Sequence, residues 1–239
     1  MEKFNTDFDF FWELINKEEN FSYSRYADGE IRLMKGIDIN LSSQAFIEDK
    51  WSASIGMTKT GEQLLETINH TESNYYYAIS APTDNIDDYT YLINNISQTK
   101  ENITFANLWI NANYHKSKEK HKELRREVIL ICNQNGQKEN FPFNVVDLIQ
   151  FPDDCVNFWE TNGDVFLNNL INRFKDSNNK LFFISCGPIS EIIIHYLYIN
   201  NPNNTYIDVG SSIDEYVHGR ITRPYMVTGT QYYNEISKF

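Results

Sequence analysis

The sequence predicts one α/β domain, with a mainly parallel, Rossmann-like β-sheet and helices on both faces. Strand-like and helix-like segments alternate along nearly the whole chain, which is typical of βαβ units. The segments 128–132 (VILIC) and 181–186 (LFFISC) are continuously apolar, as strands covered on both faces are. The 239 residues contain no repeat and no linker rich in Pro or Gly that would divide the chain. We therefore expect a single domain over residues 1–239.

The individual elements follow from local composition. Aromatic or β-branched runs that end at Gly, Pro or Asp predict strands, and apolar residues at helical spacing predict helices. The predicted strands cover 21–26, 74–80, 103–109, 128–132, 144–149, 181–186 and 205–209. The predicted helices cover 8–16, 30–35, 58–68, 86–96, 165–174 and 189–199, and the charged stretch 116–126 is expected to be a solvated helix face.

The balance of charged residues excludes several classes of partner. The chain has 21 Lys and Arg residues against 33 Asp and Glu residues, a formal net charge of −12, and its isoelectric point is near 4.8. Such a chain has no cationic surplus with which to bind nucleic-acid phosphates or an anionic lipid surface. Hydrophobic residues make up 41% of it and aromatic residues 15%, as in a folded globule. We expect a protein that binds neither nucleic acid nor an anionic membrane surface.

Cysteine usage and the apolar windows bear on location. Cys132, Cys155 and Cys186 form no C-x-x-C pair, and their odd number suits a reducing compartment better than a disulfide framework. The N-terminal apolar run contains acidic residues and no basic region, unlike a signal peptide, and no window holds about 18 uninterrupted apolar residues. We expect a cytoplasmic protein without membrane insertion. The sequence leaves its oligomeric state open, a homo-oligomer included.

The first candidate site follows the strand predicted at 21–26. Asp28 and Glu30 lie in the turn that leads to the next helix, and Arg25 precedes them. In open α/β sheets, ligands bind beyond the carboxyl ends of the strands, where this turn lies. Two carboxylates in one turn can face a hard cation, and oxygen ligands suit Mg²⁺ or Mn²⁺. An acidic first helical turn is also ordinary capping chemistry, so the triplet alone leaves both interpretations open.

The second candidate site is the turn after the strand predicted at 181–186. Pro188 suits the first position of a helix, because its missing N–H costs nothing there. The N–H groups of a first helical turn bind anions such as a diphosphate, and Gly187 lets the anion approach the backbone. The alternative is a strand-to-helix turn that simply needs Gly and Pro. The candidate anion-binding residues are Gly187, Pro188, Ile189 and Ser190.

The third candidate site follows the last predicted strand, on the same rim. Arg220 and Arg223 lie there as well and can meet a phosphate or a carboxylate. For each of these residues, a polar loop covering the sheet edge is the alternative interpretation. The candidate acid–base residues are Asp208, Asp214, Glu215 and His218, and the candidate aromatics for stacking on a base or sugar are Tyr26, Trp51 and Trp109, for which core burial is the alternative.

Three segments together resemble the GT-D-type glycosyltransferases, a family first known as a domain of unknown function. FSYSRYADGEIRLMKG is similar to that family's Arg-aromatic-Gly-Asp-Gly-Glu signature, ISCGPISEIIIHYL to its Gly-Pro turn and helix, and YIDVGSSIDEY to its final I-D-x-G segment. Their order extends the resemblance over most of the chain. Ala27 stands where we expect Gly, and Ser211 and Ser212 stand where the family often has His, which leaves His218 as the nearest imidazole.

The resemblance implies transfer of a sugar from a nucleotide-sugar donor to a carbohydrate or glycoprotein acceptor. It also implies a divalent metal on the family's D-x-E motif, which falls here on Asp28 and Glu30. In this interpretation Mn²⁺ or Mg²⁺ bridges the donor diphosphate, while Arg25 and the turn at 187–190 add positive potential.

Two other function classes remain open at the level of sequence. A metal-dependent nucleotidyl- or phosphotransferase would share the metal and the anion site but cleave a P–O bond. A non-catalytic nucleotide- or glycan-binding module would bind a ligand without turnover. The absence of G-x-G-x-x-G and of a Walker motif disfavours a dinucleotide cofactor and a P-loop NTPase.

Overall fold

The computed structural model describes residues 2–40, 52–54 and 58–239 and confirms the α/β architecture. In this part of the chain a seven-stranded sheet has the order β5-β4-β1-β9-β8-β6-β7, and each neighbouring pair in it is parallel. Its strands are β1 (Ser22–Tyr26), β4 (Tyr75–Ile79), β5 (Ile103–Phe105), β6 (Val128–Asn133), β7 (Val145–Phe151), β8 (Leu181–Ser185) and β9 (Thr205–Asp208).

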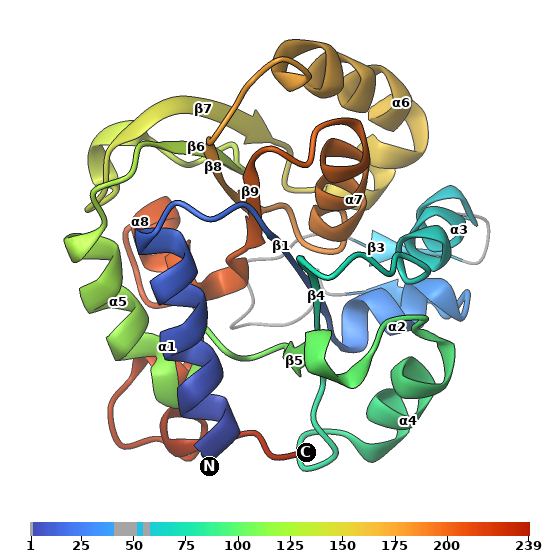
Figure 1. The fold of residues 1–239 in the computed structure, drawn as a ribbon. Coiled ribbons are helices and arrows are strands. Elements are labelled where there is room, and N and C mark those ends of the chain that lie inside the picture. The colour runs from blue at the N-terminus through green and yellow to red at the C-terminus, as the bar shows by residue number, and fades with distance from the viewer. Residues whose placement is uncertain (1, 41–51, 55–57) are drawn as a thin grey trace.

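Helices cover both faces of the sheet (Figure 1). One face carries α1 (Glu2–Asn16), α5 (Tyr114–Glu123) and α8 (Asp214–His218). The other face carries α2 (Asp28–Met34), α3 (Thr58–Thr67), α4 (Ile86–Asn95), α6 (Cys155–Phe174) and α7 (Ser190–Asn200). The charged stretch expected to be a helix face is α5, whose lysines pair with glutamates on its exposed side.

Each face of the sheet has its own apolar core. On the α1 face, Phe8 and Trp12 of α1 pack their rings against Trp109. On the other face, Trp159 of α6 is fully buried. Gly163 follows one helical turn later, where a Cβ would come within 2.7 Å of the Trp159 ring. Since β1 runs between the two cores, its residues are nearly all buried, and its carboxyl end is held firmly in place.

A close contact between backbones positions α2, the helix that carries Asp28 and Glu30. A Cβ on Gly61 of α3 would lie 2.5 Å from the carbonyl oxygen of Leu33, which is closer than real Cβ contacts allow. Glycine therefore lets α3 pack directly on the backbone of α2. This contact holds the C-terminal turn of α2 against α3.

Several element boundaries differ from those expected. α1 begins at Glu2 and not at residue 8, because Phe4 extends the apolar stripe of Phe8 by one turn. α6 begins at Cys155 and not at residue 165, because its buried stripe passes through a segment whose Asn and Gly suggest a loop. β5 ends at Phe105, after which the chain turns.

Three further features correct the sequence-based expectations. α7 begins at Ser190, so Pro188 precedes the helix instead of opening it. The described residues also include a short antiparallel pair, β2 (Ile39–Asn40) and β3 (Ser52–Ala53), and the short helix α8. Strands of two residues show no alternation that a sequence pattern could reveal.

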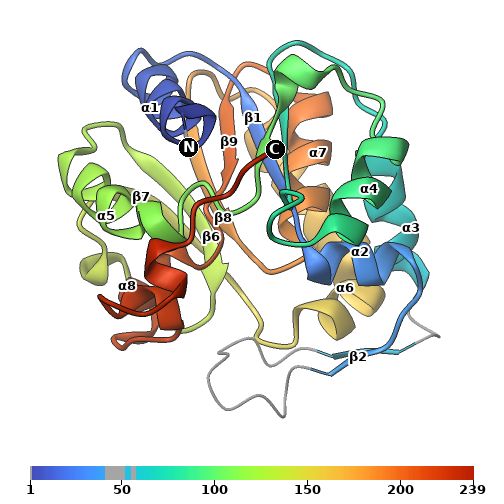
Figure 2. The same ribbon diagram turned by 90° about the horizontal axis from the view of Figure 1, so that it is seen from below.

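The remaining expectations concern cysteines and membranes. Cys132, Cys155 and Cys186 are buried thiols. Within the described ranges, no helix combines the length and the apolar character needed to cross a bilayer. Beyond α8 the chain continues as an irregular segment, dark red in Figure 2, that runs from α8 to the loop before α4, where Lys238 bonds Thr83.

His121 makes the stability of the fold sensitive to acid. It is buried on α5 among Trp12, Phe143 and Phe183, and this burial lowers its pKa to about 3. The unfolded chain takes up a proton near pH 6.5 that the folded protein excludes, so stability present above pH 6.5 is lost as the pH falls. Between pH 7.5 and pH 4.5 we predict a loss of about 2–3 kcal/mol in unfolding free energy from this residue. His121→Phe should remove that part of the loss in guanidinium titrations. Equal losses in both proteins would contradict the prediction.

Candidate functional site

The sheet opens between β1 and β9, where the direction of strand order changes. From β1 the chain adds β4 and then β5 on one side, and β9 lies on the other side with β8, β6 and β7 beyond it. β1 pairs with β9 only at Ser22 and Tyr23, whereas it pairs with β4 along its whole length. The carboxyl ends of β1 and β9 therefore separate. A crevice at such a reversal point is the usual ligand site of open α/β sheets.

Side chains replace the missing strand pairing in this crevice. The backbone N–H of Arg25 donates to the Glu191 carboxyl Oε1 at 3.3 Å. Its side chain crosses to β9, where Nε donates to Asp208 Oδ2 at 2.9 Å. The other oxygen of Asp208 accepts the Gly210 N–H at 2.7 Å. Arg25 and Asp208 thus join the two strand ends through a nearly buried ion pair.

Gly210 gives the Arg25 guanidinium its place. Its φ is +48°, and a Cβ there would lie 2.9 Å from the guanidinium carbon. A larger residue would be strained and would also push the Arg25 side chain away. The side chain of Arg25 is 20% exposed, and its Nε is held by Asp208. A fixed, partly exposed arginine side chain is suited to binding a phosphate or a carboxylate.

A third acid lies beneath this pair. Glu191, in the first turn of α7, is fully buried, and its Oε2 has no hydrogen-bond partner among the described residues. Burial, together with the neighbouring carboxylates of Asp208 and Glu30, raises the pKa of Glu191 well above its usual range. Burial thus disfavours the charged form of Glu191, and the ion pair of Arg25 is formed with Asp208. Glu191 stands beside an apolar run in the sequence, and nothing in that run indicates that its carboxyl group contacts Arg25.

Glu30 and Asp28 differ in their surroundings. Glu30 is 5% exposed, and its Oε2 accepts the Ala27 N–H at 2.8 Å, which is the reciprocal bond of a capping box at the start of α2. Burial raises the pKa of Glu30 to about 7, against the opposing charge of Arg25. Asp28 is exposed at the first position of the same helix. The structure therefore gives Glu30 an architectural contact and leaves Asp28 facing solvent on the rim.

Asp28 and Glu30 could hold a divalent ion only together with water and substrate oxygens. No group of three His, Cys, Asp or Glu side chains suited to a metal occurs within residues 2–40, 52–54 and 58–239. Mg²⁺ and Mn²⁺ commonly take one or two carboxylates and complete their shell with water and substrate phosphates. Asp28 can supply such a carboxylate. Glu30 can do so through the oxygen that is not bonded to Ala27.

In the turn after β8, several N–H groups that could bind an anion donate hydrogen bonds within the turn instead. The Ile189 N–H donates to the Cys186 carbonyl at 3.4 Å, and the Ser190 N–H donates to the Gly187 carbonyl at 3.0 Å. Ser190 Oγ accepts the Cys186 N–H at 2.9 Å. Ile189, Ser190 and Pro188 are buried. Gly187, with φ +55°, is the one of the four candidate residues that lines the open pocket beside the turn. Anion binding here would use the Gly187 surface more than the helix start.

That pocket lies beyond the carboxyl ends of β6, β7 and β8. Asp214 and His218 of α8 line it together with Gly187, as the third candidate site requires. Asp214 is 8% exposed and accepts the Thr222 hydroxyl at 2.9 Å. Two lining residues, Asn133 and Asp153, were not expected. Asn133 ends β6, and Asp153 lies two residues after β7. The position near the carboxyl end of a strand was the signal available in the sequence.

The other two candidate acid–base residues lie outside the pocket lining. Asp208 is 2% exposed and is committed to Arg25 and Gly210. Glu215 faces α5, where its Oε2 accepts the Tyr114 hydroxyl and the Lys118 ammonium, both at 2.7 Å. Burial works to raise the pKa of Glu215, but these hydrogen bonds prevail and lower it. A carboxylate held in this way is a weak base.

The candidate stacking aromatics belong mainly to the cores. Tyr26 and Trp109 are buried at 0% and 3% exposure, which agrees with the core interpretation. Trp51 lies outside the described residues. Stacking on a ligand by Tyr26 or Trp109 would require them to leave their present packing.

Comparison with known proteins connects this geometry to a known fold. No family model matches the chain, and no curated protein does. A selenomethionine-substituted structure of domain of unknown function 1792 (DUF1792) is similar with a TM-score of 0.55 and 15% identity, over 95% of this chain and 88% of that chain. The chain has the DUF1792 fold. A second structure, at TM-score 0.52 and 14% identity with the same coverage, is of that highly conserved domain, described as having a distinct glycosyltransferase fold.

The DUF1792 fold confirms, at the level of architecture, the resemblance found in three sequence segments. Those segments end β1, join β8 to α7, and end β9, and in the sheet these three strands are neighbours. Residues almost 200 positions apart in the sequence therefore meet in one crevice, with Arg25 and Asp208 in contact.

The buried ion pair should matter far more for stability than an exposed one. Asp208→Asn leaves the Arg25 charge without its partner, and we predict a loss of about 3–5 kcal/mol in unfolding free energy. Glu215→Gln is the control, because Glu215 also pairs with a cation but is 36% exposed, and it should cost about 1 kcal/mol or less. Urea titrations of both variants measure the difference. Losses of similar size would show that the crevice is not a dry environment.

Proposed function

We propose that this protein is a metal-dependent glycosyltransferase that moves a sugar from a nucleotide-sugar donor to a glycan or glycoprotein acceptor. The observation that carries the proposal is the Arg25 side chain, which Asp208 holds between the carboxyl ends of β1 and β9 and which is 20% exposed. A fixed cation at this point suits a diphosphate. The similarity to structures with a glycosyltransferase fold supports the choice of sugar transfer over other diphosphate chemistry.

The proposed reaction breaks the bond between the anomeric carbon and the diphosphate oxygen. The electron pair leaves with the nucleoside diphosphate, whose growing charge Arg25 offsets through groups that are already in place. An acceptor hydroxyl forms the new bond to the anomeric carbon and gives up its proton. His218 and Asp214 are the candidate residues to accept that proton, because both line the pocket beside Gly187.

In this proposal Asp208 and Glu191 act through Arg25 and do not touch the sugar. Asp208 sets the direction of the guanidinium, and Glu191 binds the Arg25 backbone. Glu215 ties α8 to α5 through Lys118 and so fixes the helix that carries His218. The roles of positioning and of proton transfer are thereby assigned to different residues.

Mn²⁺ or Mg²⁺ would supply Lewis-acid stabilisation of the leaving diphosphate. Asp28 is the carboxylate best placed to hold it, since it is exposed at the rim. Glu30 would contribute in addition by keeping the turn in shape through its bond to Ala27. In this assignment Asp28 holds the ion, and Glu30 is needed mainly for its hydrogen bond.

The two acids can be separated by substitution to amides. Gln keeps the oxygen that caps α2, so Glu30→Gln should stay folded and retain transfer activity within about threefold. Asp28→Asn removes the proposed metal carboxylate, and we predict a loss of about 100-fold with a higher Mn²⁺ requirement. The assay measures the nucleoside diphosphate released from UDP- and GDP-sugars, and the CMP released from CMP-sugars, with Mn²⁺ and with EDTA.

The outcomes distinguish the competing functions as well. Near-full activity in both variants removes the pair from the metal site. Release of pyrophosphate or of a monophosphate from the UDP- or GDP-sugars would favour a nucleotidyl- or phosphotransferase. Saturable nucleotide binding with no product at any metal concentration would favour a binding module, and it would contradict the proposed transfer.

A further inference from the structure

The chain segment after α8 lies on the rim beyond β4 and β5, beside the crevice. Asp84 and Asn107 follow these two strands, and Ser237 comes between them from the C-terminal segment. Ser237 is fully buried, whereas Asp84 itself is exposed. Two strand ends thus present polar groups that the protein covers with its own hydroxyl.

The Ser237 hydroxyl faces two acceptor oxygens but has one hydrogen to donate. Its hydroxyl oxygen lies 2.9 Å from Asp84 Oδ2 and also contacts Asn107 Oδ1. Both of those atoms are acceptors, and one hydroxyl has a single hydrogen to donate. The Asn107 amide is turned so that its Nδ2 donates to Asp84, at 3.4 Å, which leaves its oxygen directed at Ser237. A ligand with two adjacent hydroxyl groups would give each acceptor its own hydrogen.

The acceptors are held in position whether or not Ser237 is present. The Ala81 N–H donates to Asp84 Oδ2 at 3.2 Å, in the turn that leaves β4. β4 is the neighbour of β1, and adjacent strands lie about 4.8 Å apart. An acid at the end of the strand next to the phosphate-binding turn is the position that binds ribose hydroxyls in dinucleotide folds. Asp84 lies in the turn that leaves the strand next to the one that carries Arg25.

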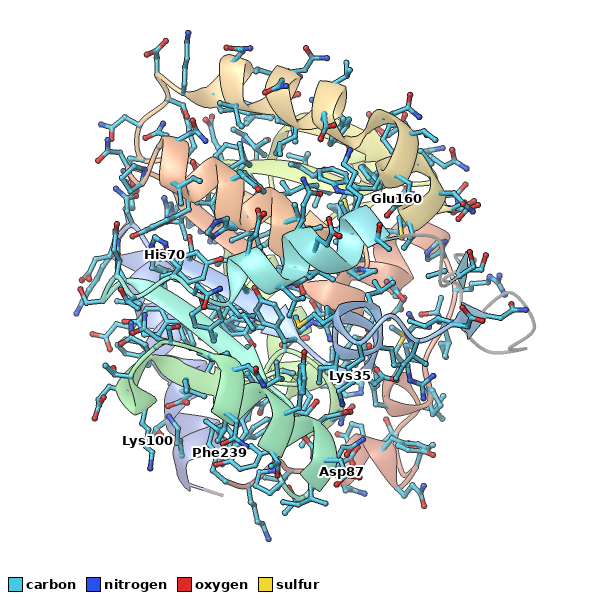
Figure 3. The ribbon with its side chains drawn as sticks, turned by 90° about the vertical axis from the view of Figure 1, so that its right-hand side faces the viewer. Lys35, His70, Asp87, Lys100, Glu160 and Phe239 are labelled. Atoms are coloured by element: carbon cyan, nitrogen blue, oxygen red, sulfur yellow. The ribbon has the colours of Figure 1, made fainter. Side chains whose placement is uncertain are left out.

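An aromatic face lies beside this pair of acceptors, and the same segment covers it. Phe239 stacks on Phe105 with ring centroids 4.2 Å apart and planes at 15°. Phe239 and Lys100 lie on the same side of the molecule (Figure 3). Beside Phe239 there is a hollow of about 260 Å³, lined in part by Tyr89, Ile93 and Lys100. Parallel stacking on an aromatic ring is also how proteins hold a nucleobase. Ser237 and Phe239 stand where the ribose and the base of one nucleoside would be bound.

We propose that Asp84 and Asn107 form the ribose-diol clamp of the nucleotide donor, next to a base-stacking face on Phe105, and that residues 235–239 occupy this subsite as an internal substitute for the nucleoside. The inference rests on the proposed function in that it supplies the nucleoside half of the donor site. The donor then binds only to molecules in which residues 235–239 have left the subsite. The apparent donor affinity is therefore reduced by the fraction of molecules in which the subsite is free.

The competing explanation is purely architectural. β5 is an edge strand of three residues, and a covering segment protects such an edge from pairing with other chains. Glu235 supports either explanation, since it anchors the segment through Asn111 Nδ2 at 2.7 Å. The two explanations differ in what happens to nucleotide affinity when the contacts of Ser237 and Phe239 are removed.

The test is calorimetric binding of UDP, GDP and CDP, each beside its 2′,3′-dideoxy analogue, to the full chain. In Ser237→Ala/Phe239→Ala, at least one ribonucleotide should bind about tenfold more tightly than in the unchanged protein. Lys238→Ala is the matched control, because this residue lies between the two and bonds Thr83 through its backbone. It should bind within about twofold of the unchanged protein.

The clamp is tested in the same series. The double variant should prefer the ribonucleotide over its dideoxy analogue by about tenfold, and adding Asp84→Asn should abolish that preference. Circular dichroism checks that each variant is folded, and the single variants Ser237→Ala and Phe239→Ala serve if the double one is not. Unchanged or weaker affinity in the tail variants, no diol preference, or no nucleotide bound by any variant would overturn the proposal.

Sugar transfer, measured separately, keeps this inference distinct from the proposed function. A tail variant that binds ribonucleotides tightly but transfers no sugar refutes the transferase and leaves the clamp standing. If substitutions of Asp84 and Ser237 change neither nucleotide affinity nor sugar transfer, the ribose clamp is refuted. The proposed transferase activity is then unaffected.

Discussion

The ion pair between Arg25 and Asp208 is the contact on which the candidate site depends. Since β1 and β9 pair at only two positions, their carboxyl ends would separate freely without a bridge. The guanidinium supplies that bridge at 2.9 Å, and Glu191 beneath it accepts the backbone N–H of Arg25. The positive charge of Arg25 thus lies among three acids, Asp208, Glu30 and Glu191. The same contact closes the sheet and presents a cation to the crevice.

The pair divides the rim into two halves with different characters. Toward β8, β6 and β7 the rim is open, and Asp214 and His218 line a polar pocket there. Toward β4 and β5 the rim is covered by the chain's own last described residues, which place Ser237 on Asp84. A donor held at Arg25 would extend its nucleoside toward the covered half and direct its sugar toward the open one. In this arrangement the nucleoside is bound on one side of Arg25, and proton transfer takes place on the other side.

Much of this architecture could be read from the sequence, and the limits have physical causes. Aromatic, β-branched and continuous apolar runs predicted each strand of the main sheet, and the rule for strand ends selected Arg25, Asp28, Asp214 and His218 as candidates. Glu191 was missed because nothing in an apolar helix marks a buried acid whose partners come from other strands. Glu30 was expected to face a cation, and its bond to Ala27 depends on cap geometry that a three-residue motif does not specify. The cover over Asp84 depends on contacts between residues more than 150 positions apart, which no local pattern reveals.

The most direct measurement is the ¹⁵N–¹H resonance of Arg25 Nε, identified by its loss in Arg25→Lys, during titration with inorganic pyrophosphate and with UDP. Arg126, whose guanidinium bonds the Ile15 carbonyl at the amino ends of the strands, is the internal control. The account predicts a saturable shift of the Arg25 signal, no shift of the Arg126 signal, and no saturable response in Asp208→Asn. An Arg25 signal that stays in place while either anion binds, or that moves no more than Arg126, would contradict it.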